Sequence, residues 1–205
     1  MKGDVTMSVN GLDTASACTN IANTIKKAGY VFVARYYGNY RLTLTEAKAL
    51  SKAGLEIVAV WENGRPTSAS YFSYDKGYSD GTSAYNYAKN NIDQPNYTPI
   101  FFAVDYDASD SDIHSVITNY FNGISAAFTN LGSAYDIGAY GSGAVLSYLY
   151  SKVSGVSYKW LAKSTGWRGH STYTDWDIKQ GSTVTVGGIT FDSDTGKSYG
   201  GFQVF

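Results

Sequence analysis

The stretch PIFFAVDYD, residues 99–107, joins an apolar run to two aspartates. An unbroken apolar run of this length is typical of a β-strand that is covered on both faces, as strands of parallel sheets are. Residues 110–130 follow with an amphipathic pattern that predicts a crossover helix. Together they predict a βα unit with Asp105 and Asp107 at the carboxyl end of its strand.

The same order of strand and helix repeats along the rest of the chain. Strands are predicted at residues 7–12, 30–37, 55–61, 136–140, 158–162 and 174–178, and residues 182–191 alternate like a strand or a hairpin. Helices are predicted at residues 17–27, 43–53 and 79–91. Thr43, with Glu46 three residues later, has the pattern of a capping box. A polar loop that starts at Asn63 is long enough to cover a site.

Seven or eight strands with helical crossovers predict an α/β fold: a small (β/α)8 TIM-like barrel with shortened later helices. The length of 205 residues predicts one domain, residues 1–205. The alternative is a doubly wound open sheet. Against it, no GxGxxG motif follows the first strand, and the GSG at 141–143 is too short for that fingerprint.

The overall charge argues against a nucleic-acid partner. Sixteen basic and seventeen acidic residues leave a formal net charge of -1, so the chain lacks the basic field that phosphate backbones require. No apolar run predicts membrane insertion. Residues 1–7 do not read as a secretory signal, so we expect a phage-encoded protein or export by a non-classical route. The lone Cys18 predicts a small buried thiol.

Aromatic residues are abundant, with nineteen tyrosines, nine phenylalanines and four tryptophans. Aromatic faces cover the apolar surface of sugars, while phenols hydrogen-bond to hydroxyl groups. Tyrosines that simply coat a stable extracellular surface would give the same composition. Both interpretations remain open at this point.

Acids follow several predicted strands directly or nearly so, at Asp13, Glu62, Asp105 and Asp107. The carboxyl ends of barrel strands meet at one mouth, so these side chains are predicted to share a pocket. Crowded, partly desolvated carboxylates raise one another's pKa, which lets one serve as a general acid while another stays ionised. The pattern favours glycoside hydrolysis.

The polar residues also fit other interpretations. Asp107 equally fits a helix cap or turn. Clustered acids also bind Mg²⁺ or Ca²⁺, but no phosphate-cradling loop accompanies them, and neither metal nor cofactor is expected. His114 and His170 are isolated, and no GxSxG motif supports a serine triad.

Six motifs carry a family resemblance. They are GLDTAS (11–16), VARYY (33–37), AVWE (59–62), FFAVDYD (101–107), GAYGS (138–142) and WDIKQ (176–180). In this order they resemble a bacterial glycoside-hydrolase-like TIM-barrel family, formerly a domain of unknown function, over about residues 11–202. More distantly the chain resembles the glycoside hydrolase family 25 lysozymes.

The resemblance implies roles for the acids. Asp13 and Asp105 match the first-strand and central aspartates of the lysozymes, but Asp107 stands where they carry a glutamate. Glu62 is therefore assigned the proton-donor role, with Asp105 as base or electrostatic stabiliser. The residues expected to bind sugar lie in or beside the matching motifs: Arg35, Tyr37, Trp61, Tyr106, Tyr140, Trp167, Trp176, Asp177 and Gln180.

The expected function is a peptidoglycan hydrolase of the muramidase type, antibacterial and bacteriolytic, acting as a monomer at the bacterial cell wall or periplasm. It would serve as an endolysin, or as an effector that a secretion apparatus delivers and an immunity protein opposes. A non-catalytic glycan-binding barrel is the main alternative. An amidase or peptidase is disfavoured, because those enzymes usually need zinc or a cysteine–histidine pair.

Overall fold

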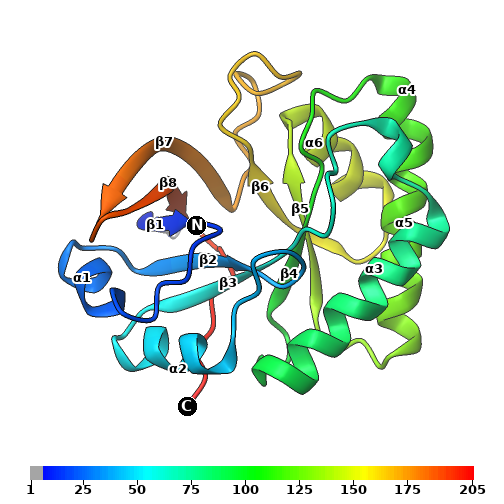
Figure 1. The fold of residues 1–205 in the computed structure, drawn as a ribbon. Coiled ribbons are helices and arrows are strands. Elements are labelled where there is room, and N and C mark those ends of the chain that lie inside the picture. Colours follow the sequence, from blue (N-terminus) through cyan, green and yellow to red (C-terminus); the bar gives the residue numbers. More distant parts are fainter. Residues whose placement is uncertain (1–6) are drawn as a thin grey trace, which may run out of the picture.

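The computed structural model describes residues 7–205, in which eight strands form a closed barrel in sequence order (Figure 1). The strands are β1 (Val9–Asp13), β2 (Phe32–Tyr36), β3 (Glu56–Trp61), β4 (Pro99–Ala103), β5 (Asp136–Gly141), β6 (Val156–Leu161), β7 (Ile178–Val186) and β8 (Ile189–Gly196). β1 to β7 pair in parallel, and β8 runs antiparallel to both neighbours. The predicted small α/β barrel is confirmed.

Helices cover the outside of the barrel, except near its last strands. They are α1 (Ala22–Lys27), α2 (Leu44–Lys52), α3 (Tyr74–Tyr87), α4 (Asp110–Asp112), α5 (Thr118–Asn130) and α6 (Gly143–Lys152). A loop, residues 162–177, takes the place of a helix between β6 and β7, and projects from the barrel in Figure 1. A Gly187–Gly188 turn joins β7 to β8 directly. The prediction of shortened later helices is confirmed.

Several predicted boundaries were wrong. α1 begins five residues later than predicted, and α3 begins five residues earlier, where the Ser73 hydroxyl accepts a hydrogen bond from the Lys76 N–H. The strand predicted at 174–178 is absent apart from Ile178, the first residue of β7. Only half of the predicted capping box forms, because Thr43 caps α2 but the Glu46 carboxylate binds Arg35 instead.

The inside of the barrel is filled by large side chains that face glycines. One buried cluster consists of Phe32, Ala34, Val58, Val60, Phe101, Trp160 and Ile178. A Cβ atom at Gly11 would overlap the Phe32 ring, and one at Gly138 would overlap the Phe101 ring. This packing fills the inside of the barrel below the carboxyl ends of its strands.

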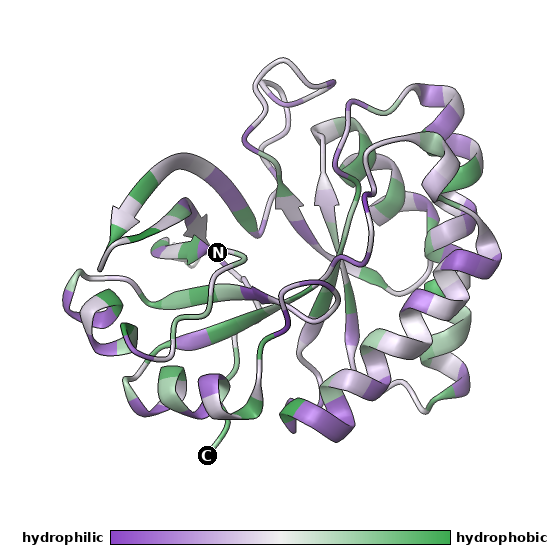
Figure 2. Ribbon diagram, viewed as in Figure 1, coloured by the Kyte–Doolittle hydropathy of each residue, from purple (hydrophilic) through white to green (hydrophobic). Residues whose placement is uncertain are grey.

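A second, larger core lies between the strands and the helices. Figure 2 shows hydrophobic stretches along β2, β3 and β4, with many hydrophilic residues on the helices. α3 and α5 approach closely because Gly77 lies against the backbone of Tyr120, and Gly123 against that of Tyr74. Within residues 7–205, no helix has both the length and the apolar character needed to cross a membrane.

Candidate functional site

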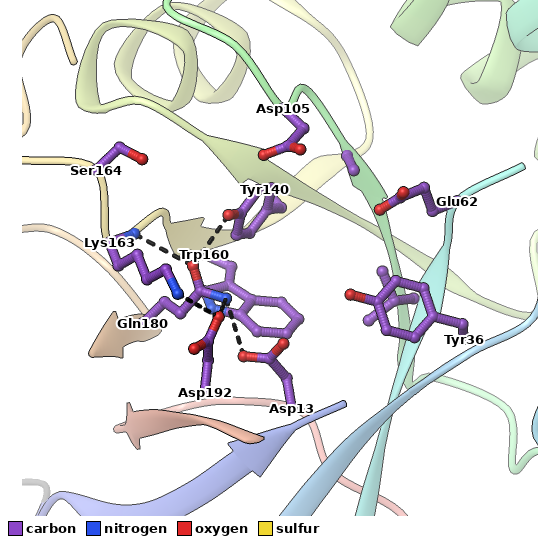
Figure 3. Close-up of a pocket in the computed structure, with 12 residues that line it drawn as sticks. Asp13, Tyr36, Glu62, Asp105, Tyr140, Trp160, Lys163, Ser164, Gln180 and Asp192 are labelled. Carbon is purple, nitrogen blue, oxygen red and sulfur yellow. Dashed lines mark hydrogen bonds and ion pairs between the residues drawn. The ribbon is translucent and has the colours of Figure 1, made fainter. Parts of the chain in front are cut away.

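A cavity of about 310 Å³ opens at the carboxyl ends of β1 to β6. We call it the mouth (Figure 3). The strands, or the segments that directly follow them, supply its lining: Asp13, Tyr36, Val60, Glu62, Ala103, Asp105, Tyr140, Trp160, Lys163, Ser164, Gln180 and Asp192. The barrel thus gathers side chains from the whole length of the chain into one polar site.

Strand alternation decides which side chains reach the mouth. Successive residues of a strand point to opposite faces, so Ala34 and Tyr36 of β2 face inward. Arg35 faces outward and is buried. On β3, Val60 faces inward, and Glu62, directly after the strand, continues on the same face.

Glu62 points into the mouth from the side opposite Lys163 and Gln180 (Figure 3). Burial raises the pKa of its carboxyl to about 7, and repulsion from Asp105 and Asp13 adds to the effect. A substantial fraction of Glu62 is therefore protonated at neutral pH. It is suited to donate a proton.

Asp105 lines the mouth two residues after β4. Burial raises the pKa of this carboxyl too, but the Lys163 ammonium opposes the change. The Asp105 backbone N–H donates to the carbonyl of Pro66, at 2.9 Å, which ties it to the loop after β3. Burial thus favours the protonated form of both Glu62 and Asp105, and at Asp105 a nearby cation acts against this.

A hydrogen-bond network built on Gln180 holds Asp13. The Gln180 Nε2 donates to Asp13 Oδ2 at 2.9 Å. The Gln180 Oε1 accepts from the Tyr140 hydroxyl at 3.0 Å and from the Lys163 backbone N–H at 3.2 Å. Burial raises the pKa of the Tyr140 phenol, so it stays a neutral donor. These bonds fix the orientation of three cavity residues.

Two further acids extend from β8 toward Asp13. Asp192 pairs with Asp13 across the strands, and its carboxylate accepts from the Lys163 ammonium at 2.6 Å. Asp194 lies one inward position deeper, is 3% exposed, and accepts from the Trp160 indole at 3.1 Å. Burial, followed by the charge of Asp13, raises the pKa of Asp194 well above its usual range. Burial thus favours the protonated form of Asp194.

Gln180, a predicted binding residue, lines the mouth, and so do four other predicted site residues. Asp13, Glu62, Asp105 and Tyr140 all line it. Asp107 does not. Its carboxylate is exposed and accepts a hydrogen bond from the Arg168 backbone N–H at 2.8 Å. Asp107 therefore connects the segment after β4 to the loop at 162–177.

Three predicted sugar-binding residues on β2 and β3, or next to them, lie outside the mouth. Arg35 is buried in an ion pair with Glu46 at 2.8 Å, and it donates to the carbonyl of Thr14. The Tyr37 hydroxyl donates to Gln94 at 2.7 Å. Trp61 is buried in the outer core. These side chains hold the barrel to its helices and loops.

The other predicted sugar-binding residues also lie elsewhere. Tyr106 packs on Phe72. Trp167 is half-buried in the loop at 162–177 and does not line the mouth. The Lys197 ammonium lies 3.7 Å from the centre of the Trp176 ring. Asp177 accepts from the Lys159 backbone N–H at 2.9 Å, before β7 begins.

Sequence reasoning missed several residues of the site: Tyr36, Trp160, Lys163, Ser164, Asp192 and Asp194. Two of them carried a usable signal. In FDSD, residues 191–194, two acids recur at the strand period of two, so they share a face. Tyr36 lies two residues beyond the inward Ala34, but apolar residues occur on both faces of β2 and hide the alternation.

The chemistry of the mouth is that of an acid–base pair beside aromatic surfaces. Glu62 supplies a proton donor and Asp105 a carboxylate, while Tyr36, Tyr140 and Trp160 offer rings and polar hydrogens. Within residues 7–205, no group of three or more His, Cys, Asp or Glu residues has a metal-holding arrangement.

Comparisons with known proteins agree with this architecture. A family model described as "Rv2525c-like, glycoside hydrolase-like domain" matches residues 23–195. FadG of Bacillus subtilis (strain 168) is 33% identical, over 84% of this chain and 32% of FadG. YbfG of the same organism is 32% identical, over 98% of this chain and 31% of YbfG. The chain thus spans a minor part of the length of these relatives.

Solved structures share the fold. The Mycobacterium tuberculosis Tat-secreted protein Rv2525c, in complex with L-tartrate, has a TM-score of 0.79 at 20% identity, covering 94% of this chain and 98% of that one. A family 25 glycosyl hydrolase from Bacillus anthracis has a TM-score of 0.53 at 11% identity, covering 98% and 96%. The resemblance that the six motifs predicted is confirmed.

Proposed function

Because the chain belongs to the Rv2525c-like, glycoside hydrolase-like family, we propose that it is a glycosidase of the muramidase type that cleaves the glycan backbone of the bacterial cell wall. The observation that carries this proposal is Glu62, held in the mouth with a pKa of about 7 and facing Asp105 and Asp13. The structural likeness to a family 25 glycosyl hydrolase supports it.

In the proposed reaction, Glu62 donates its proton to the oxygen of the glycosidic bond. The bond from that oxygen to the anomeric carbon breaks, and positive charge develops on the sugar ring. Asp105 stabilises this charge or deprotonates the attacking water. The Lys163 ammonium favours the ionised form of Asp105 that this role needs. Water supplies the hydroxyl group of the new reducing end.

Residues around the acids position the sugar in this scheme. Gln180, fixed by its bonds to Asp13 and Tyr140, keeps the Asp13 carboxyl directed at the cavity. The rings of Tyr36 and Trp160 border the same space and cover the C–H faces of a sugar. The mouth therefore combines shape, hydrogen bonding and acid–base chemistry at one place.

The proposed setting is the wall or periplasm, where an antibacterial, bacteriolytic hydrolase would meet peptidoglycan. The description of Rv2525c as Tat-secreted supports export for a barrel of this kind. Endolysin and delivered effector are both compatible with this setting. The long relatives FadG and YbfG place such a domain within larger proteins.

The test uses purified sacculi and the matched variant Glu62→Gln. We expect the unaltered protein to release new reducing ends and Glu62→Gln to lose roughly 10²–10⁴-fold in rate, which is typical when a general acid is removed. Thermal unfolding of both proteins checks that the variant is folded. Equal rates for the two proteins would exclude Glu62 as the proton donor.

A non-catalytic glycan-binding barrel is the second candidate. The position of Asp107 favours it. This residue matches the glutamate of the lysozymes in sequence, but its side chain lies outside the mouth. If the unaltered protein sediments with sacculi but releases no reducing ends, this second candidate replaces the first.

A further inference from the structure

Glu62 lies one residue beyond the end of β3, so the pairing of the strands does not fix it. Within residues 7–205, no hydrogen bond holds the Glu62 carboxyl, whereas Gln180 holds that of Asp13 (Figure 3). The direction of the Glu62 side chain therefore depends on its own backbone and on the segment that follows. We call this segment, residues 62–71, the Glu62 loop.

Hydrogen bonds to carbonyl groups at the start of the Glu62 loop hold it in place. The Glu62 carbonyl accepts from the Asn39 N–H at 2.8 Å. The Asn63 carbonyl, on the next residue, accepts from the Tyr71 hydroxyl at 2.9 Å. A Cβ atom at Gly64 would lie 3.3 Å from the Tyr71 ring, so the ring also rests against this end of the loop. Tyr71 thus joins the two ends of the loop.

Tyr71 is in turn held by a polar cluster that lies outside the mouth. The Asp80 carboxylate, on α3, is 3% exposed and lies 3.0 Å from the Tyr71 hydroxyl. It accepts from the Lys76 ammonium at 2.6 Å and from the Tyr120 hydroxyl of α5 at 2.9 Å. The Lys76 ammonium also donates to the Tyr71 oxygen at 3.2 Å. Since Lys76 and Tyr120 both donate to Asp80, the single hydroxyl hydrogen of Tyr71 is available for Asn63.

We infer that Tyr71 is a positioning residue for Glu62, and that Asp80 acts through Tyr71 from outside the mouth. This inference rests on the proposed glycosidase function, in which Glu62 must meet the oxygen of the glycosidic bond. The bond from Tyr71 to the Asn63 carbonyl keeps the backbone next to Glu62 in place, so that the carboxyl stays directed into the mouth. Its placement matters because a proton is transferred only over hydrogen-bond distance.

Tyr71→Phe tests the inference, because it removes the hydroxyl and keeps the ring. Water should then reach Glu62 more easily, so the pKa of its carboxyl should fall from about 7 toward 4.5, as measured by carbon NMR. On soluble, peptide-free glycan strands of the wall, kcat should fall about 10- to 100-fold at a similar KM, as a misplacement of about 1 Å can cause. Tyr78→Phe is the matched control and should change neither value, because the Tyr78 hydroxyl accepts from Asn130 outside the mouth.

Asp80→Asn keeps the size of the side chain and removes its charge, so it should have a smaller effect of the same kind. The double variant should be no worse than Tyr71→Phe, since both changes act through one hydrogen bond. Additive effects would contradict the role of Asp80. Thermal unfolding of each variant checks that it is folded.

The inference is overturned if Tyr71→Phe leaves the titration of Glu62 unchanged, or if it raises KM and leaves kcat as it was. Neither result would affect the glycosidase proposal, which depends on the release of reducing ends by the unaltered protein. If that protein releases none, the glycosidase proposal fails, and the titration alone decides whether Tyr71 positions Glu62.

Discussion

At the scale of single residues, the carboxyl groups of the mouth lie in different environments. Glu62 and Asp105 share one cavity and burial raises the pKa of both, but the Lys163 ammonium opposes this rise only at Asp105. Asp194 is buried beneath Asp13, and this burial raises the pKa of its carboxyl well above the usual range. The three carboxyl groups thus differ in the surroundings that set their pKa values, which suits them to different roles.

The coupling of Glu62 to Asp105 gives a prediction at this scale. Asp105→Asn removes a negative charge near Glu62, so the pKa of Glu62 should fall below about 7. Carbon NMR of the Glu62 carboxyl, followed through a pH titration, measures the change. Lys163→Met should instead leave Glu62 titrating near neutrality. A Glu62 that titrates near 4.5 in the unaltered protein contradicts the assignment of the proton donor.

At the scale of elements, the carboxyl ends of the strands carry the mouth, and connections outside it support them. The loop at 162–177 is fixed by Asp107, and by an Arg168–Asp110 ion pair of 2.7 Å. On the opposite flank, Arg35 joins β2 to α2 through Glu46. Asp107 and Arg35, both predicted as site residues, thus stabilise the elements around the mouth and do not line it.

The close crossing of α3 and α5 gives a second prediction. In Gly77→Ala the new methyl group would meet the Tyr120 carbonyl, which belongs to rigid helix backbone. We expect a loss of about 1–3 kcal/mol in the free energy of unfolding, as for other overpacked sites. Urea denaturation measures it. Gly166→Ala is the control, since its Cβ would have no neighbour within 4 Å, and an equal loss there would argue against the crossing as the cause.

At the scale of the whole molecule, the barrel concentrates buried acids at one end. Burial raises the pKa of Asp13, Glu62, Asp105 and Asp194 in the folded state. Above the usual carboxyl range, the folded chain therefore binds more protons than the unfolded chain. The free energy of unfolding therefore falls as pH rises and these buried acids ionise.

This imbalance predicts how stability depends on pH. The stabilisation by these groups is complete below their unfolded pKa values and is lost as pH rises through the folded ones. The free energy of unfolding should therefore fall between pH 5 and 8, by at most about 1.4 kcal/mol per pH unit for each group. Asp194→Asn, which mimics the neutral acid, should flatten the decline in urea unfolding curves. Stability that rises over this range contradicts the prediction.

The sequence by itself determined the barrel fold and the position of the candidate site at the carboxyl ends of the strands. Apolar runs such as PIFFAV require burial on both faces, and the acids that follow them mark strand ends, so Asp13, Glu62 and Asp105 were placed together correctly. Alternation could not be read where both faces of a strand are apolar. The family motif VARYY pointed to Arg35 and Tyr37, whereas Tyr36 is the residue of this motif that lines the mouth.

Only the tertiary structure decided which polar residues meet. Asp192, Asp194 and Gln180 reach Asp13 because β8 runs antiparallel and closes the barrel against β1. Asp107 turns outward to hold the backbone of Arg168. Local patterns report burial and period, whereas these partners are far apart in sequence and are brought together only by closure of the barrel.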